Sequence, residues 1–111
     1  MPLHQTDLVV QTLDVETPET CYVLYVPQID KYVAEVATGE IPGKLIIFWD
    51  SQAKAEQFIV QNNLLEKHGV TAIVVRHMCF DTLRDIARNR GVIGIRDHRY
   101  ALLSDYGVYY V

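Results

Sequence analysis

Residues 71–97 read TAIVVRHMCFDTLRDIARNRGVIGIRD, and this stretch decides the predicted fold. It opens with Thr71–Val75, an apolar and largely β-branched run without alternation, which is typical of a strand covered on both faces, as in a parallel sheet. Asp81 is a good helix cap, and apolar residues then recur at helical spacing up to Gly91, which can end a helix in the left-handed conformation. Val92–Ile95 is predicted as the next strand.

The chain before this stretch is predicted to alternate between strands and helices in the same way. Strands are predicted at Cys21–Val26 and Lys44–Trp49, because each is an apolar run bounded by proline or other turn-forming residues. Helices are predicted over Ile29–Ala37 and residues 50–68, where apolar side chains recur at helical spacing. Strands separated by helices indicate a mainly parallel sheet with helices packed on its faces.

The two ends of the chain complete the predicted domain. Tyr100–Leu103 and Val108–Val111 predict a C-terminal β-hairpin, and Asp7–Val15 predicts an edge strand or a short helix joined to the domain by the polar connector Glu16–Thr20. The 111 residues therefore predict a single α/β domain of two or three layers, with residues 1–20 as an N-terminal edge element and connector. An antiparallel α+β arrangement of the ferredoxin-like kind is the alternative.

Composition limits the class of protein. Half of the residues are hydrophobic and 22% are charged, which is typical of a folded globular domain. No apolar run approaches the roughly 20 residues of a membrane span, and no lysine or arginine precedes Lys31, as a signal peptide would require. The two cysteines form no close pair, so a disulfide framework is not expected and a cytoplasmic location is predicted.

The charge is unevenly distributed along the chain. Residues 1–70 contain ten acids and four bases, about −6, whereas residues 71–111 contain four acids and six bases, about +2, which gives the net charge of −4. An acidic protein lacks the basic surface that non-specific nucleic-acid binding needs. All six arginines lie within residues 76–99, so a small anionic ligand or a protein is the expected partner.

Side chains that can carry chemistry follow the predicted strand ends. If the strands are parallel, their carboxyl ends share one edge of the sheet, where open α/β folds usually bind ligands. The predicted ligand-binding residues at or near this edge are Asp50, Ser51, Arg76, Arg84, Asp97 and His98. The alternative interpretation is structural, because Asp and Ser before a helix are good caps and Arg84 can pair with acids one helical turn away.

Cys79 and His77 form the candidate catalytic pair. Cys79 lies between a predicted strand and a predicted helix, where free amides and the helix dipole lower the pKa of a thiol, and His77 and Arg76 are close in sequence. The alternative is a small buried cysteine, since cysteine is among the most buried residue types.

Two fragments resemble the rhodanese family of single-domain sulfurtransferases. Glu40-Ile-Pro-Gly43 resembles the family's GHIPG segment, and Cys79-Phe-Asp-Thr-Leu-Arg84 keeps its spacing of cysteine and arginine. The resemblance implies a persulfide on Cys79 surrounded by loop amides. The chain departs from the family by lacking glycine between Cys79 and Arg84 and by placing Asp81 there. Separately, Trp49-Asp-Ser-Gln-Ala-Lys-Ala55 is similar to a segment of the N-terminal domains of SseB-like proteins.

Two functional hypotheses follow from the sequence. The first is a small binding or interaction module without enzymatic activity, and the second is a thiol-dependent, rhodanese-like enzyme that uses Cys79. Neither needs a cofactor, and the four histidines show no metal-ligand spacing. Tyr106–Val111 is rich in tyrosine and has no charge, which predicts a homo-oligomer formed through this segment unless it is an interior strand.

Overall fold

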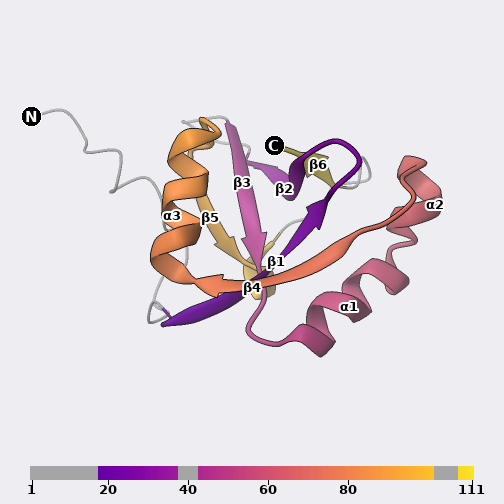
Figure 1. The fold of residues 1–111 in the computed structure, drawn as a ribbon, viewed down its shortest axis with the longest axis horizontal. Helices are drawn as coiled ribbons and strands as arrows, with labels where there is room; N and C mark the ends of the chain where they lie inside the picture. Colours follow the sequence, from indigo (N-terminus) through magenta and orange to yellow (C-terminus); the bar gives the residue numbers. More distant parts are fainter. Residues whose placement is uncertain (1–17, 38–42, 102–107) are drawn as a thin grey trace, which may run out of the picture.

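The computed structural model describes residues 18–37, 43–101 and 108–111, and in this part of the chain it shows a small α+β domain with one mixed sheet (Figure 1). The six strands are β1 (Thr20–Val26), β2 (Lys31–Ala37), β3 (Gly43–Phe48), β4 (Val74–Cys79), β5 (Gly94–Asp97) and β6 (Tyr109–Tyr110). The helices are α1 (Gln52–Gln61), α2 (Leu64–His68), α3 (Phe80–Asn89) and the 3₁₀ turn η2 (His98–Tyr100).

The prediction of a mainly parallel sheet is wrong. The strand order is β4-β1-β2-β3-β5, with β6 also paired to β2, and only β3 and β5 run parallel among the pairs of the described strands. The first three strands form an antiparallel meander, so the α+β class predicted as the alternative is closer to the observed fold. The order of elements nevertheless differs from the ferredoxin-like β-α-β-β-α-β pattern.

The predicted helix over Ile29–Ala37 is a β-strand. Tyr25 pairs with Tyr32 and Val26 with Lys31, so β1 and β2 form a hairpin whose loop includes Asp30 at φ 51°. Aspartate tolerates this left-handed conformation in turns. Four consecutive residues of β2, 32–35, are buried, which a strand with both faces covered allows and a one-sided surface helix does not.

Each face of the sheet has its own core. The core on the α3 side contains Cys21, Val23, Tyr32, Ile46, Phe48, Phe80, Leu83, Ala87 and Ile95. The core on the α1 and α2 side contains Leu24, Val26, Val33, Ile47, Trp49, Ala55, Leu64 and Val108. Adjacent residues of β1 and β3 alternate between the two cores, as the pleat requires, and Figure 1 shows the sheet between α3 and the α1–α2 pair.

The helix over residues 50–68 is confirmed in part. Ser51 is the cap of α1, since its Oγ accepts a hydrogen bond from the Lys54 N–H at 3.2 Å. The helical pattern breaks at Asn63, whose φ of 51° is left-handed, and α2 follows as a separate helix. Gly69 ends α2 at φ 65°, as its position predicts.

Helix α3 also agrees with the sequence, except at its start. Cys79 rather than Asp81 occupies the cap position, and Asp81 lies in the first turn, where its negative charge suits the positive end of the helix dipole. Gly91 follows the last turn at φ 68°, the left-handed conformation expected of it.

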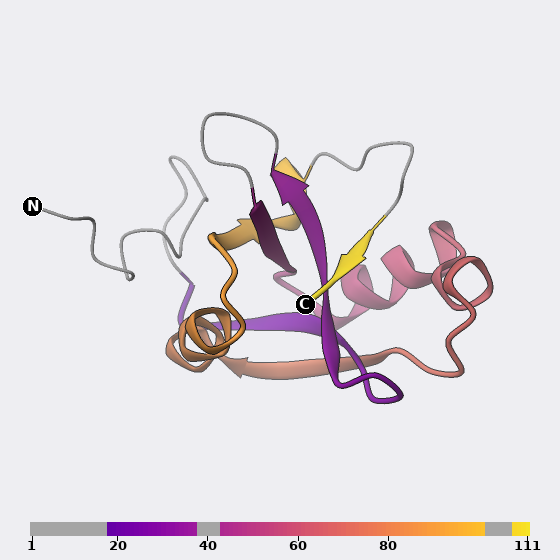
Figure 2. The same ribbon diagram turned by 90° about the horizontal axis from the view of Figure 1, so that it is seen from above.

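The predictions for Thr71–Val75 and for the C-terminal hairpin are wrong. The strand is β4, it begins at Val74, and it lies at the edge of the sheet with most of its side chains exposed. Figure 2 shows β4 along one side of the molecule, and β1 is the strand that pairs with it. Tyr100 lies in η2 and not in a strand, β6 pairs with β2, and the rest of the predicted first hairpin strand, residues 102–103, lies outside the described residues.

Some predictions fall outside the described residues, among them the element at Asp7–Val15 and the start of the Tyr106–Val111 segment. Within the described part, Val108 is buried and β6 is paired to β2 inside the same chain. No helix of this part combines the length and apolar character needed to cross a membrane.

Candidate functional site

The predicted site residues fall into two groups separated by strand β1. The first group lies at or just after the carboxyl ends of β3 and β5 and consists of Asp50, Ser51, Asp97 and His98. The second lies on β4 and the start of α3 and consists of Arg76, His77, Cys79 and Arg84. The single edge predicted for the residues that follow the strand ends is therefore replaced by two separate positions.

In the first group, Asp50 and Ser51 organise the start of α1. The Lys54 ammonium lies 3.1 Å from Asp50, and the Lys54 backbone N–H donates to Ser51. Both contacts are those of a helix start, as the structural alternative predicts. Ligand binding by these two residues stays a prediction.

Asp97 is buried, with only 3% of its surface exposed. Burial by itself raises the pKa of this carboxyl, but hydrogen bonds from the side chain and the backbone N–H of Arg99 outweigh it, so the pKa is lowered. The shortest of these bonds joins Arg99 Nη2 to Asp97 Oδ2 at 2.6 Å. Asp97 therefore stays ionised and holds η2 at the end of β5.

His98 directly follows Asp97 in the chain and is the first residue of η2. Its Nε2 is buried without a hydrogen-bond partner and lies 3.8 Å from Asp50 Oδ1, while its ring is stacked on Trp49 at 6.0 Å between centroids. Burial lowers the pKa of His98 and outweighs the carboxylates of Asp97 and Asp50, which raise it. The imidazole is therefore neutral at pH 7.

This environment predicts a pH-dependent fluorescence signal, because Trp49 is the single tryptophan of the protein. Protonation of His98 places a cation over the indole and should change its emission, with a midpoint below the ordinary pKa of about 6.5. Unfolded His98 binds a proton more readily than folded His98, so stability should also fall as the pH drops below about 6.5. Fluorescence titration of the native protein and of His98→Gln measures this, and a step that survives in His98→Gln contradicts it.

A row of aromatic rings crosses the sheet from the first group to the second. Tyr22 exchanges both backbone hydrogen bonds with Trp49, at 2.9 and 2.8 Å, on one side of β1. On the other side Tyr22 pairs with His77, and the two rings stack at 4.4 Å with an interplanar angle of 10°. The rings of Trp49, Tyr22 and His77 therefore share one face, buried at Trp49 and exposed at His77.

Cys79 and Arg84, the two residues of the rhodanese resemblance, each contact a residue of the first turn of α3. Arg84 pairs with Asp81 at 3.1 Å and lies over the Phe80 ring, and Cys79 Sγ lies 3.5 Å from Thr82 Oγ1. The thiol of Cys79 is exposed at the start of α3, so its reactivity stays a prediction. Cys21 is buried, and burial raises the pKa of its thiol to about 12, which leaves it protonated.

The backbone of β4 presents hydrogen-bonding groups to solvent. The Phe80 N–H donates to Glu19 O at 3.0 Å, and this pair continues the register of β1 and β4. Hydrogen-bonded and non-hydrogen-bonded pairs alternate along an antiparallel ladder. The residues whose backbone faces β1 are therefore Val74, Arg76 and Met78. Val75 and His77 direct their N–H and C=O groups away from β1, where no described strand pairs with them.

Arg76 is held on aromatic rings on the α3 side of this strand. Its guanidinium lies 4.6 Å from the centroid of the Tyr25 ring, and Nη1 donates to the Tyr32 hydroxyl at 2.7 Å. Among the described residues no carboxylate forms an ion pair with Arg76. The nearby Asp30 accepts from the Tyr25 hydroxyl at 2.6 Å and pairs with Arg90. Its pKa is lowered, first by the Tyr25 hydrogen bond and then by Arg90.

The tyrosines around β4 were missed in the prediction of the site. Tyr22 and Tyr25 belong to a strand that was predicted correctly, but their relation to β4 depends on the antiparallel pairing of β1 with β4. Tyr32 lies in a segment that was predicted as a helix. No local sequence signal places these rings beside Arg76 and His77.

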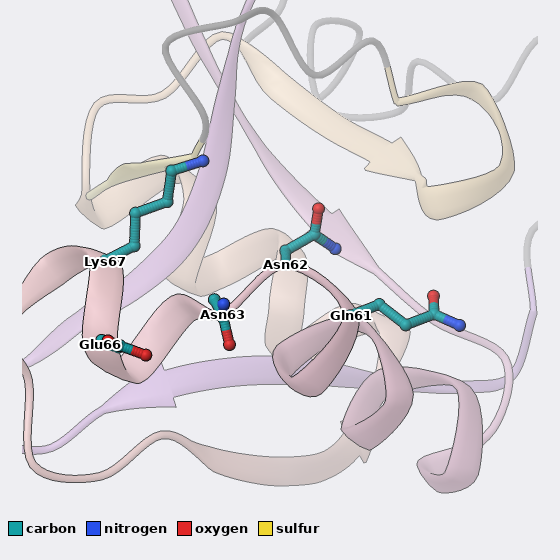
Figure 3. A pocket seen from close by; sticks show the side chains of 5 residues that line it. All are labelled: Gln61, Asn62, Asn63, Glu66 and Lys67. Atoms are coloured by element: carbon teal, nitrogen blue, oxygen red, sulfur yellow. The ribbon is translucent and has the colours of Figure 1, made fainter.

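A hollow of about 500 Å³ lies at the junction of α1 and α2, away from the predicted site residues. Its described lining is polar or charged: Gln61, Asn62, Asn63, Glu66 and Lys67. Figure 3 shows that these side chains spread along the junction and do not converge on one point. The hollow therefore offers no arrangement of catalytic groups.

The described residues also contain no cluster of three histidine, cysteine, aspartate or glutamate side chains that could hold a metal ion. The fold and the β4 edge define a small α+β domain with an open strand on its surface. No family model matches the chain, and searches among curated proteins and solved structures find no significant match.

Proposed function

We propose that this domain is a binding module that takes an extended protein segment as an additional strand along β4. The observation that carries the proposal is the row of outward N–H and C=O groups of Val75 and His77 on a strand of six residues. An extended peptide can satisfy such groups with its own backbone, as in other cases of strand addition. Six residues span about 20 Å, the usual length of a strand in a globular protein.

The other edges of the sheet are less suitable for an added strand. Strand β5 has four residues and leads directly into η2, and β6 has two residues. Short edge strands are one of the ways in which proteins prevent unwanted pairing. Strand β4 has neither a proline nor a lysine, and Val74 is 43% exposed.

The module is proposed to act without enzymatic activity and in the cytoplasm, where the free thiols of Cys21 and Cys79 would stay reduced. A homo-oligomer through Tyr106–Val111 is less favoured, since Val108 is buried and β6 already pairs with β2. The same edge can also pair with β4 of a second copy of the chain, which would compete with an added segment. Light scattering on the free protein therefore precedes any binding experiment.

Hydrogen exchange should detect the added strand. In the free protein the amides of Val75 and His77 should exchange faster than those of Arg76 and Met78, because only the latter are bonded to β1. A soluble hexapeptide of alternating threonine and valine should slow the two outward amides roughly tenfold when its concentration is about ten times its Kd. Exchange followed by NMR on the full chain measures both effects.

N-methylated peptides provide the matched control. A strand has two edges, so a peptide methylated on the amides of one edge should still bind through the other. A peptide methylated on neighbouring amides blocks both edges and should lose binding. Slowing of the Val75 and His77 amides by this doubly blocked peptide, or no slowing by the unmodified one, would exclude strand addition.

A further inference from the structure

We infer that the segment bound by β4 pairs antiparallel to it and carries an aromatic residue directly followed by an acidic residue. The inference rests on the proposed strand addition and specifies the partner. It follows from two neighbouring residues of β4, Arg76 and His77, whose side chains lie on opposite faces of the sheet. Each face presents a different chemistry to the incoming strand.

The aromatic position lies opposite His77. One face of the His77 ring is stacked on Tyr22, and the exposed side of His77 ends the row of rings that begins at Trp49. An incoming residue paired with His77 forms the hydrogen-bonded kind of pair, because the backbone of His77 faces outward. Its side chain lies on the same face as Tyr22 and His77, so an aromatic ring there extends the row and gains stacking contact.

The acidic position lies opposite Arg76. The backbone of Arg76 faces β1, so an incoming residue opposite it forms the non-hydrogen-bonded kind of pair, in which side chains approach more closely. Arg76 forms no ion pair with a described carboxylate, and its guanidinium is already positioned by Tyr25 and Tyr32. This cation lies on the β1–β2 side of β4, so the long side chain of a glutamate on the added strand has to extend across β4 toward it, and the cation has little conformational freedom to lose.

Arg76 itself favours an acid over a base at this position, because the other arginines on this side of the sheet are already paired with carboxylates. Arg84 and Arg90 lie on the same side of the sheet as Arg76, and their nearest carboxylates, Asp81 and Asp30, already pair with them. A basic residue opposite Arg76 would meet like charge. Because β4 and its partner run in opposite directions, the residue opposite His77 precedes the one opposite Arg76, which gives the order aromatic and then acidic.

Five peptides of equal length test the order and the chemistry. The probe Thr-Tyr-Glu-Val-Thr should bind the full-length protein about fivefold more tightly than Thr-Tyr-Gln-Val-Thr and about fivefold more tightly than Thr-Thr-Glu-Val-Thr. The reordered Thr-Glu-Tyr-Val-Thr should bind as weakly as these two, and preferential binding of the reordered peptide would overturn the antiparallel assignment. Fluorescence anisotropy of end-labelled peptides measures the affinities.

Charge reversal provides the decisive variant. Arg76→Glu should weaken the binding of Thr-Tyr-Glu-Val-Thr about tenfold and should favour the fifth peptide, Thr-Tyr-Lys-Val-Thr. Arg88→Glu makes the same change of charge on α3, where Arg88 pairs with Asp85, and should leave the preference for the glutamate peptide unchanged. A circular dichroism spectrum of each variant establishes that it is folded, and the direct comparison of two peptides on one variant is independent of its stability.

The outcomes separate this inference from the proposed function. If all five peptides slow the exchange of the Val75 and His77 amides with equal affinity, strand addition stands and the aromatic-acidic preference is wrong. If none of them slows the exchange, strand addition itself is wrong. If the Arg76→Glu variant still binds the glutamate peptide more tightly than the lysine peptide, Arg76 does not recognise the acidic residue.

Discussion

Ile46→Asp is expected to leave the protein unfolded. Ile46 is 0% exposed and lies in β3 between Ala34 of β2 and Ile95 of β5, on the face covered by α3. A carboxylate at this position has no described cation to pair with, and burial of an unpaired charge costs several kcal/mol or more. A domain of this size has roughly 5–15 kcal/mol in total. Circular dichroism and a thermal melt of the purified variant measure the loss of cooperative folding.

Val74→Asp is the matched control for this variant. Val74 also lies in a strand and is also replaced by aspartate, but its side chain is 43% exposed at the edge of the sheet. The change should therefore cost about 1 kcal/mol or less. A folded Ile46→Asp variant, or an unfolded Val74→Asp variant, would contradict the positions of β3 and β4 in the sheet.

The sequence predicted the elements whose signals are local. Cys21–Val26 and Lys44–Trp49 are continuous apolar runs, and the structure has β1 and β3 there. Ser51 and Gly69 lie at the two ends of the α1–α2 segment, as the chemistry of caps and left-handed glycines requires. These features depend on the backbone within a few residues, so the sequence alone was sufficient.

The errors concern features that depend on distant partners. Ile29–Ala37 has apolar residues at positions that fit a helix, but the same residues also fit a strand buried on both faces, and pairing with β1, β3 and β6 selects the strand. An apolar run such as Thr71–Val75 likewise does not say whether it lies inside a sheet or at its edge. The structure places β4 at the edge because β1 pairs with it on one side and no described strand does on the other.

The candidate site also combines residues that the sequence predicted with an arrangement that depends on distant partners. His77 and Arg76 were chosen from the sequence, although for a thiol site and an anion site at the end of parallel strands. Antiparallel pairing of β1 and β4 instead places them beside Tyr22 and Tyr25. Because of that pairing, the backbone N–H and C=O groups of β4 point alternately toward β1 and away from it. The residue types alone could not predict this alternation.

Trp49→Ala is expected to destabilise the domain by about 3–5 kcal/mol, the usual range for removal of a buried tryptophan. Trp49 is 1% exposed, packs edge-on against Phe58 at 5.0 Å between centroids and stacks with His98, so the substitution opens a cavity between the sheet and α1. Chemical denaturation followed by circular dichroism measures the change, because the variant no longer contains a tryptophan for fluorescence.

His77→Ala is the control at the exposed end of the same row of rings. Its stacking on Tyr22 lies at the surface, so its removal should change stability by about 0.5 kcal/mol or less. The two variants should therefore show that Trp49, at the buried end of the row, supports the sheet and that His77, at the exposed end, does not. A Trp49→Ala variant that loses less than about 1 kcal/mol would show that the buried end of the row does not support the core, and a His77→Ala variant that loses as much as Trp49→Ala would show that His77 belongs to it.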